Sequence, residues 1–191
     1  MQNLINAIER YVHLNTNDIE WINNHFEIKI IPKNGCLLKP GLICNSFAFV
    51  RNGLLRHSIF DEDGVAKTIY FSAENEFVCD YESFYGRQPS IKQIAAIEET
   101  TIIAISYSNM QLFYSQISVG ERFGRLLSEE VFNNVLRHVV AMHTNSAEEL
   151  YLNFISAYSH LQQRIPQYFI ASFVGVTPQS LSRIRRNIAK K

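Results

Sequence analysis

The segment from Gln167 to Arg186 constrains the fold of this chain more than any other part of the sequence. It reads QYFIASFVGVTPQSLSRIRR. A helix-turn-helix joins two short helices by a turn of about 3–4 residues, so it needs a small residue where the helices cross and one that tolerates positive φ in the turn. Ala171 and Gly175 have these two properties. The segment therefore predicts a helix-turn-helix.

Thr177 and Pro178 mark the start of the second helix. Threonine is a good N-cap residue, and proline is well suited to the first helical position. We expect the helix to begin at Pro178 and to run to about Ala189. The apolar residues expected to close a small core between the two helices and the rest of the protein are Ile170, Val174, Val176, Leu181 and Ile184.

The opposite face of the second helix suits nucleic acid. Gln179, Ser182 and Arg183 should point away from the apolar residues, next to Thr177 and Pro178 at the helix start. Arginine can bridge guanine O6 and N7, and glutamine can pair with adenine. Further basic side chains would contact phosphates without reading sequence. These are Arg185, Arg186, Lys190 and Lys191.

Apolar spacing alone would also fit two amphipathic helices in an ordinary core, and a basic C-terminus alone is typical of a solvated tail. The charge distribution favours DNA. The net charge is zero, but residues 1–149 carry 12 basic and 18 acidic residues, for −6, whereas residues 150–191 carry six basic residues and no acidic ones, for +6. A basic end attracts DNA phosphates while an acidic body is repelled, which would orient the protein on a duplex.

The N-terminal half has a different texture. Residues 1 to about 26 have helical spacing, with Asn17 as the expected cap. From Glu27 to Ser106, turn signals recur at intervals of about 8–12 residues, which is typical of an all-β sandwich or barrel. Phe77–Phe84 is expected to hold a short helix within this region. The expected strands are Phe47–Val50, Leu54–Phe60, Lys67–Phe71 and Thr101–Ile105.

Helical spacing returns after the β region, with a short helix expected at Asn109–Ser115 and a long one at Val119–His143. The long helix is apolar over more than one face, so we expect it to pack on the β domain and on a second copy of the chain. The alternative is a helix buried within one chain. Thr144–Ser146 resembles a hinge, and a further helix is expected at Ala147–Leu161.

Several classes of protein are disfavoured. No apolar run reaches the roughly 18 residues of a membrane span, and the N-terminus lacks the features of a signal peptide, so we expect a cytoplasmic protein. No metal-ligand spacing is present. Acidic residues cluster between positions 74 and 82 without a nucleophile–base pattern, so no catalytic residue and no enzyme activity is expected. The cysteines, expected to be small buried residues, are Cys36, Cys44 and Cys79.

The order of β region, long helix and C-terminal helix-turn-helix resembles the Crp/Fnr family of bacterial transcription factors. The motif IASFVGVTPQSLSRIRR is similar to the version found in regulators of the Bacteroidetes. The resemblance implies an α+β chain, with a cyclic-nucleotide-binding-like β jelly roll in residues 1–117, a dimerisation helix and hinge in 118–145 and a helix-turn-helix domain in 146–191. It implies a homodimeric, sequence-specific DNA-binding regulator with base contacts at Pro178, Gln179 and Arg183.

Two departures from the family pattern stand out. Members that bind cyclic nucleotides carry a Gly-Glu pair followed by Arg-Ser or Arg-Thr, but here Cys79 replaces the glycine, Asp80 keeps an acid and Arg87 is displaced from the phosphate position. An unpaired phosphate in a partly dry pocket is costly, so cyclic AMP or cyclic GMP is disfavoured and no cofactor is expected. The region could hold another effector or be only a scaffold. The residues that align with the effector pocket are Phe77, Cys79, Asp80, Tyr81, Arg87 and Ser90.

The second departure is that Asn187–Lys191 are too few for the β-hairpin wing that usually follows the recognition helix. A helix-turn-helix lacking a full wing is therefore expected, with the basic tail making phosphate contacts. The partners implied are double-stranded DNA, a second copy of the chain, RNA polymerase and an unknown small-molecule effector, with no membrane. The alternative function is a ligand-binding sensor that docks a protein partner through its helical C-terminus.

Overall fold

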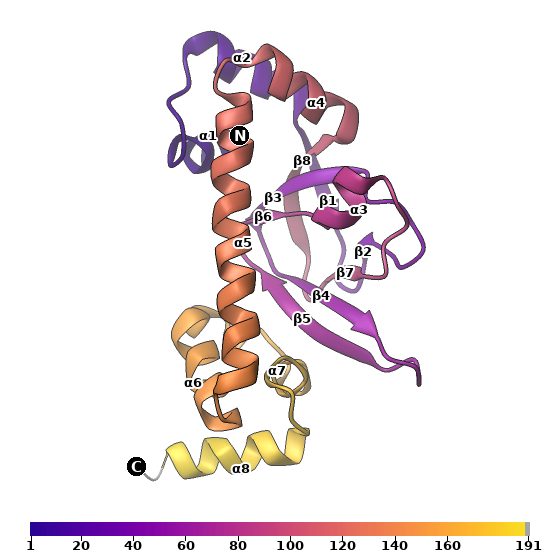
Figure 1. Ribbon diagram of the computed structural model, residues 1–191, viewed down its shortest axis with the longest axis vertical. Coiled ribbons are helices and arrows are strands. Elements are labelled where there is room, and N and C mark those ends of the chain that lie inside the picture. Colours follow the sequence, from indigo (N-terminus) through magenta and orange to yellow (C-terminus); the bar gives the residue numbers. More distant parts are fainter. Residues whose placement is uncertain (190–191) are drawn as a thin grey trace.

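Two antiparallel sheets form the β domain (Figure 1). The structure is a computed structural model and describes residues 1–189; the predicted phosphate contacts Lys190 and Lys191 lie outside them. Each sheet has four strands, in the orders β1-β8-β3-β6 and β2-β7-β4-β5, and this arrangement is consistent with the predicted jelly roll. The strands are β1 (Glu27–Ile31), β2 (Cys36–Leu38), β3 (Ser46–Asn52), β4 (Leu55–Phe60), β5 (Ala66–Ser72), β6 (Phe77–Val78), β7 (Gln93–Ala96) and β8 (Thr100–Ser106).

The four strands predicted from the sequence are confirmed as β3, β4, β5 and β8. Four successive residues of β3, Phe47–Val50, are buried, because this strand packs on helices as well as on neighbouring strands. The sequence did not single out β1, β2 or β7. In β1 only Ile31 is buried, and the other two strands are short, so none of them shows a strong apolar pattern.

Two N-terminal helices, α1 (Gln2–Glu9) and α2 (Thr16–His25), lie in the region predicted to be helical. The prediction that Asn17 caps a helix is wrong, because α2 begins at Thr16, two residues before the start that a cap at Asn17 would give. Asn15 is the N-cap: its Oδ1 accepts from the Asp18 N–H at 3.0 Å, and the Asp18 carboxylate accepts from the Asn15 N–H at 3.0 Å. This reciprocal capping box sets the start of α2.

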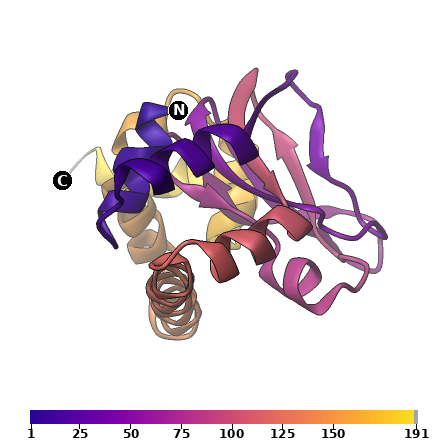
Figure 2. The ribbon, with the colours of Figure 1, turned by 90° about the horizontal axis from the view of Figure 1, so that it is seen from above.

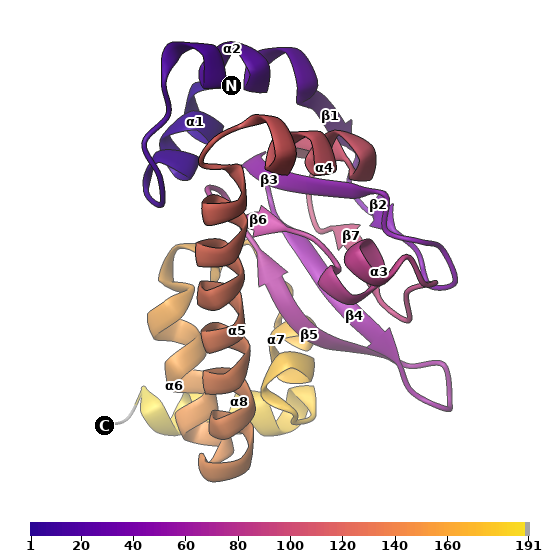
Figure 3. The same cartoon turned by 45° about the horizontal axis from the view of Figure 1, so that its top comes forward.

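The short helices of the β domain lie close to their predicted positions. Helix α4 (Tyr107–Gln116) contains the predicted Asn109–Ser115. Helix α3 (Tyr81–Gly86) begins later than the helix predicted at Phe77–Phe84, because the first residues of that segment pair with β3 as strand β6. Figure 3 shows α1, α2 and α4 together at one end of the β domain, far from the C-terminal helices.

The long helix α5 (Gly120–Thr144) stands beside the two sheets and extends past them (Figures 1 and 2). Its first half packs on the β domain, where Phe123 and Leu127 are buried. Gly120 allows this approach, because a Cβ there would lie 2.4 Å from the carbonyl oxygen of Phe113. The second half has an exposed apolar face on the side away from the protein body. The residues of this face are Phe132, Val135, Leu136, Val139 and Val140.

The C-terminal unit, residues 146–189, is helical. The helix predicted at Ala147–Leu161 is interrupted: α6 (Ala147–Ala157) is followed by the 3₁₀ turn η1 (Ser159–Leu161). Helices α7 (Gln167–Val174) and α8 (Pro178–Ile188) come next. An apolar core runs continuously from the β domain into this unit. Within residues 1–189 no helix is long and apolar enough to cross a membrane.

Candidate nucleic-acid interface and effector region

Helices α7 and α8 form the predicted helix-turn-helix. Gly175 ends α7 with φ of +79°, in the left-handed region that glycine adopts at little cost. The N–H of the next residue, Val176, donates to the Ala171 carbonyl at 2.9 Å and closes the turn. Figure 1 shows α7 nearly end-on and α8 lengthwise, so the two helices cross. Ala171 is fully buried at the helix pair, as expected for a small contact residue.

Thr177 and Pro178 start α8 as predicted. The Thr177 Oγ1 accepts from the Ser180 N–H at 3.2 Å, and Pro178 is the first helical residue. Leu181 is buried, and Ile184 packs against the same core. The apolar side of α8 is therefore fixed to the protein body, which leaves its other side free.

The exposed side of α8 carries the predicted base-reading residues. Gln179, Ser182, Arg183 and Arg186 are exposed and recur at helical spacing, so they share one face. Within residues 1–189, Arg183 and Arg186 have no hydrogen-bond or ion-pair partner. Arg185 is also exposed, but its Nη1 donates to the Gln167 Oε1 at 2.7 Å, which ties it to the start of α7. The two free guanidinium groups are available to an external acceptor.

Asp80 lies at the start of α3, and this chain engages both oxygens of its carboxylate. The Ser90 hydroxyl donates to Oδ2 at 2.6 Å, and the Lys92 Nζ lies 2.6 Å from Oδ1. The Asp80 side chain is only 2% exposed, and a buried charge requires such partners. Ser90 and Lys92 are therefore already occupied. An anion that used them would have to displace Asp80.

Arg87, the displaced arginine of the family comparison, does not join Asp80 and Ser90. It ends α3 in the left-handed region, with φ of 53°. Its Nη1 donates to the Cys44 carbonyl at 3.1 Å, and its Cζ lies 4.3 Å from the centroid of the Tyr107 ring. Within the described part of the chain it contacts neither oxygen of the buried carboxylate. The structure thus places the Arg87 guanidinium apart from the cluster of Asp80, Ser90 and Lys92.

The other predicted pocket residues are mostly enclosed. Phe77 stacks on Phe47, with 5.6 Å between ring centroids. Burial raises the pKa of the Cys79 thiol and that of the Tyr81 hydroxyl. The Tyr81 hydroxyl is a buried group with no hydrogen-bond partner among residues 1–189. The predicted pocket residues are therefore largely enclosed beside the Asp80–Lys92 ion pair.

His57, which sequence reasoning did not consider, is buried close to that ion pair. Burial, and then the positive charge of Lys92, lower its pKa to about 4. Its Nε2 lies 2.9 Å from the Ser72 Oγ. The imidazole is therefore neutral at neutral pH and adds no positive charge that could attract an anion.

No protein-family model and no curated protein matches this sequence. Solved structures do match. FixK2 from Bradyrhizobium japonicum superposes with a TM-score of 0.76 at 12% identity, over 86% of this chain and 85% of that one. The c-di-GMP-responsive global regulator CLP of Xanthomonas campestris gives 0.70 at 15% identity, over 92% of both chains. A protein described as a transcriptional regulator of the Crp/Fnr family from Eubacterium rectale gives 0.70 at 17% identity, over 92% of this chain and 84% of that one.

This chain has the Crp/Fnr fold. The fold and the resemblance expected from the sequence are thereby confirmed, and the similar structures are described as regulators rather than enzymes.

Within this Crp/Fnr fold, two residues with notable contacts were not predicted from the sequence, Lys92 and Arg164. Lys92 carries no signal beyond its position two residues after Ser90, and Arg164 lies in a loop with no motif. Both act through partners distant in the sequence.

Proposed function

We propose that this protein is a sequence-specific DNA-binding transcription regulator that acts as a homodimer. The observation that carries the proposal is the division of α8 into a buried apolar side and an exposed side with free arginines. Gln179 and Arg183 would read base edges, and Ser182 lies between them on the same face. Thr177, Arg185 and Arg186 would position the helix on the backbone, because phosphate contacts set register without reading sequence. Pro178 begins the helix at the base-contacting position that the resemblance implies.

The exposed apolar face of α5 supports the homodimer. Phe132 is 66% exposed and Val135 is 55% exposed, in one patch that a single copy leaves uncovered. Paired helices bury such a face, and two recognition helices would then enter successive major grooves about 34–36 Å apart. Sedimentation tests this: the wild type should be dimeric, and Leu136→Glu should be monomeric at the same concentration. A monomeric wild type would contradict the proposal.

DNA binding is tested by selecting genomic fragments with the purified protein at moderate salt. We expect enrichment of fragments with a two-fold symmetric site, and an affinity that falls steeply as salt rises, because counterions are released from the phosphates. The Gln179→Ala, Arg183→Ala double variant is the control and should enrich none of them. If the wild type prefers no fragment over random duplex, the function is not DNA recognition, and docking of the C-terminal unit to a protein becomes the better account.

Cyclic nucleotides are not part of the proposed mechanism. Ser90 and Lys92, the donors beside the predicted pocket, are held by Asp80, and the Arg87 guanidinium binds the Cys44 carbonyl instead. Calorimetric titration with cyclic AMP and cyclic GMP should give no saturable heat. Micromolar binding of either one would contradict this part of the proposal. RNA polymerase is the proposed protein partner, and the cytoplasm, where DNA and polymerase are accessible, is the proposed location.

A further inference from the structure

The C-terminal unit packs directly on the second sheet of the β domain. Strand β5 is the edge strand of that sheet, and α7 lies against it. The ring of Phe71, which is fully buried, lies 5.6 Å from that of Phe173 and 6.0 Å from that of Phe154, between centroids. Leu54, Ala73 and Ile97 complete the β-domain side of this core.

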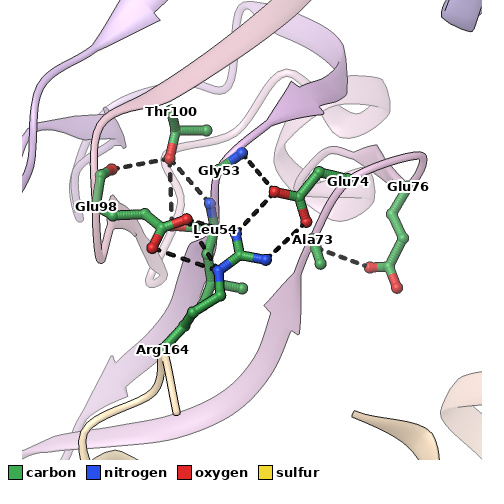
Figure 4. A network of polar contacts seen from close by, with 8 residues as sticks. All are labelled: Gly53, Leu54, Ala73, Glu74, Glu76, Glu98, Thr100 and Arg164. Carbon is green, nitrogen blue, oxygen red and sulfur yellow. Dashed lines mark hydrogen bonds and ion pairs between the residues drawn. The ribbon is translucent and has the colours of Figure 1, made fainter. Parts of the chain in front are cut away.

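Arg164 adds directional contacts to this interface. It lies between η1 and α7 and reaches two glutamates in turns of the β domain (Figure 4). Its Nη2 lies 2.7 Å from the Glu74 Oε1 and its Nη1 lies 3.1 Å from Oε2, a bidentate pair, while Nε donates to the Glu98 Oε1 at 3.2 Å. The planar guanidinium makes such a fork specific in orientation as well as attractive.

Glu74 is itself held in place by the β domain. Its Oε1 also accepts from the Gly53 N–H at 2.8 Å, at the turn before β4. Partial burial raises the pKa of Glu74, but hydrogen bonds from Arg164 and Gly53 outweigh it and lower the pKa below its ordinary value. The carboxylate is therefore ionised where Arg164 binds it, and the Gly53 N–H holds it in place.

Two further contacts lie along α7. The Thr68 N–H on the open edge of β5 donates to the Ser172 Oγ at 2.9 Å. The Arg56 guanidinium lies 4.0 Å from the centroid of the Phe169 ring. Helix α7 thereby covers an otherwise unpaired strand edge. With α7 docked in this way, Gln179, Ser182 and Arg183 remain exposed.

From these contacts we infer that Arg164 is a positioning residue: it clamps the C-terminal unit to the β domain through Glu74 and Glu98, and the clamp holds α8 in its DNA-binding orientation without an effector. The inference rests on the proposed function. A ligand that shifts an equilibrium must bind one state better than the other. Here the docked state is already stabilised by a buried core and an ion-pair network, so DNA binding would not require a small-molecule effector.

The test compares two DNA duplexes derived from a fragment selected by the wild type, one with both half-sites and one with a single half-site. Arg164→Gln should weaken binding to the two-half-site duplex by roughly tenfold, the equivalent of about 1.4 kcal/mol, and leave single-half-site binding unchanged, because only the former requires two heads at a fixed spacing. Glu98→Gln should give a smaller loss. Lys29→Gln, which removes an exposed ion pair on β1, should change neither affinity.

Hydrogen exchange provides a readout without DNA. The Thr68 amide, which donates to α7, should exchange faster in Arg164→Gln and at the wild-type rate in Lys29→Gln. Unchanged exchange, equal loss on both duplexes, or tighter binding by Arg164→Gln would overturn the clamp. A tenfold gain in wild-type affinity on adding a deproteinised cell extract would overturn effector independence. A wild type that prefers no DNA fragment would instead remove the proposed function, while the exchange experiment still decides whether the clamp exists.

Discussion

The charged groups on the exposed face of α8 lack partners within residues 1–189, whereas those in the buried region around Asp80 are paired. On α8, Arg183 and Arg186 have no partner within residues 1–189, although they extend into solvent beside other cations. Around Asp80, Ser90 and Lys92 are paired at 2.6 Å with a carboxylate from the same chain. Unpaired surface charge costs little in water, whereas buried charge must be neutralised. The arginines of α8 are therefore available to an external acceptor, whereas Ser90 and Lys92 are already bound by Asp80.

The largest expected effect tests the buried region. Asp80→Ala should lower the free energy of unfolding by about 3–5 kcal/mol, because it leaves Lys92 and Ser90 without their acceptor in a mostly enclosed site. Urea denaturation followed by fluorescence measures this. Asp61→Ala, which removes an exposed carboxylate paired with Lys67 at 3.1 Å, is the control and should have little effect. An unchanged midpoint for Asp80→Ala would mean that the ion pair does not stabilise the region.

The next effect tests the exposed region. Arg183→Ala should weaken binding to the selected DNA by about 1–3 kcal/mol and relax the preference at one base pair of each half-site, because the arginine is proposed to read a base. Competition between the site and its single-base variants measures both changes. Arg87→Ala, which removes a guanidinium from the effector region, is the matched control and should keep wild-type specificity. Equal losses on all sequences would assign Arg183 to the phosphate backbone instead.

A third prediction concerns the pH dependence of stability, which the buried His57 near Asp80 should affect. The pKa of His57 is lowered to about 4, so the stability that depends on its neutral form is present above pH 6.5, the ordinary value, and is lost as pH falls toward 4. The contribution of His57 to the free energy of unfolding should decline in that window by up to about 1.4 kcal/mol per pH unit, while Glu76, whose pKa is raised by burial to about 7, contributes with the opposite sign. His57→Gln should remove the His57 contribution and change the slope accordingly. An unchanged slope in this variant would exclude His57 as the titrating group.

The smallest effect concerns Arg186. Its replacement by alanine should weaken binding to all DNA sequences almost equally. It should also reduce the slope of log affinity against log salt concentration by about 1, as expected for one lost phosphate contact. Titrations at several salt concentrations measure the slope. If Arg186→Ala changed specificity more than Arg183→Ala, the roles would be reversed: Arg186 would contact a base and Arg183 a phosphate.

Features set by neighbouring residues could be predicted from the sequence. The start of α8 at Pro178, the turn at Gly175 and the extent of α5 follow from capping, backbone freedom and helical spacing, which act over a few residues. The exposed side of α8 follows from the same local pattern. One error, the assignment of the cap to Asn17 in place of Asn15, was also local and arose because several polar residues there can cap a helix.

Contacts between distant segments could be found only in the tertiary structure. Arg164 meets Glu74 across 90 residues and Glu98 across 66 residues, and no spacing rule connects them. Lys92 reaches Asp80 only because β7 and the start of α3 come together in the β domain. The amino-acid sequence by itself determined the amphipathic pattern of α8 and the presence of apolar residues over more than one face of α5. The tertiary structure decided how the C-terminal unit is held on the β domain, and that Asp80 is paired with Lys92. Both depend on long-range packing, because an ion pair forms wherever the fold brings opposite charges together.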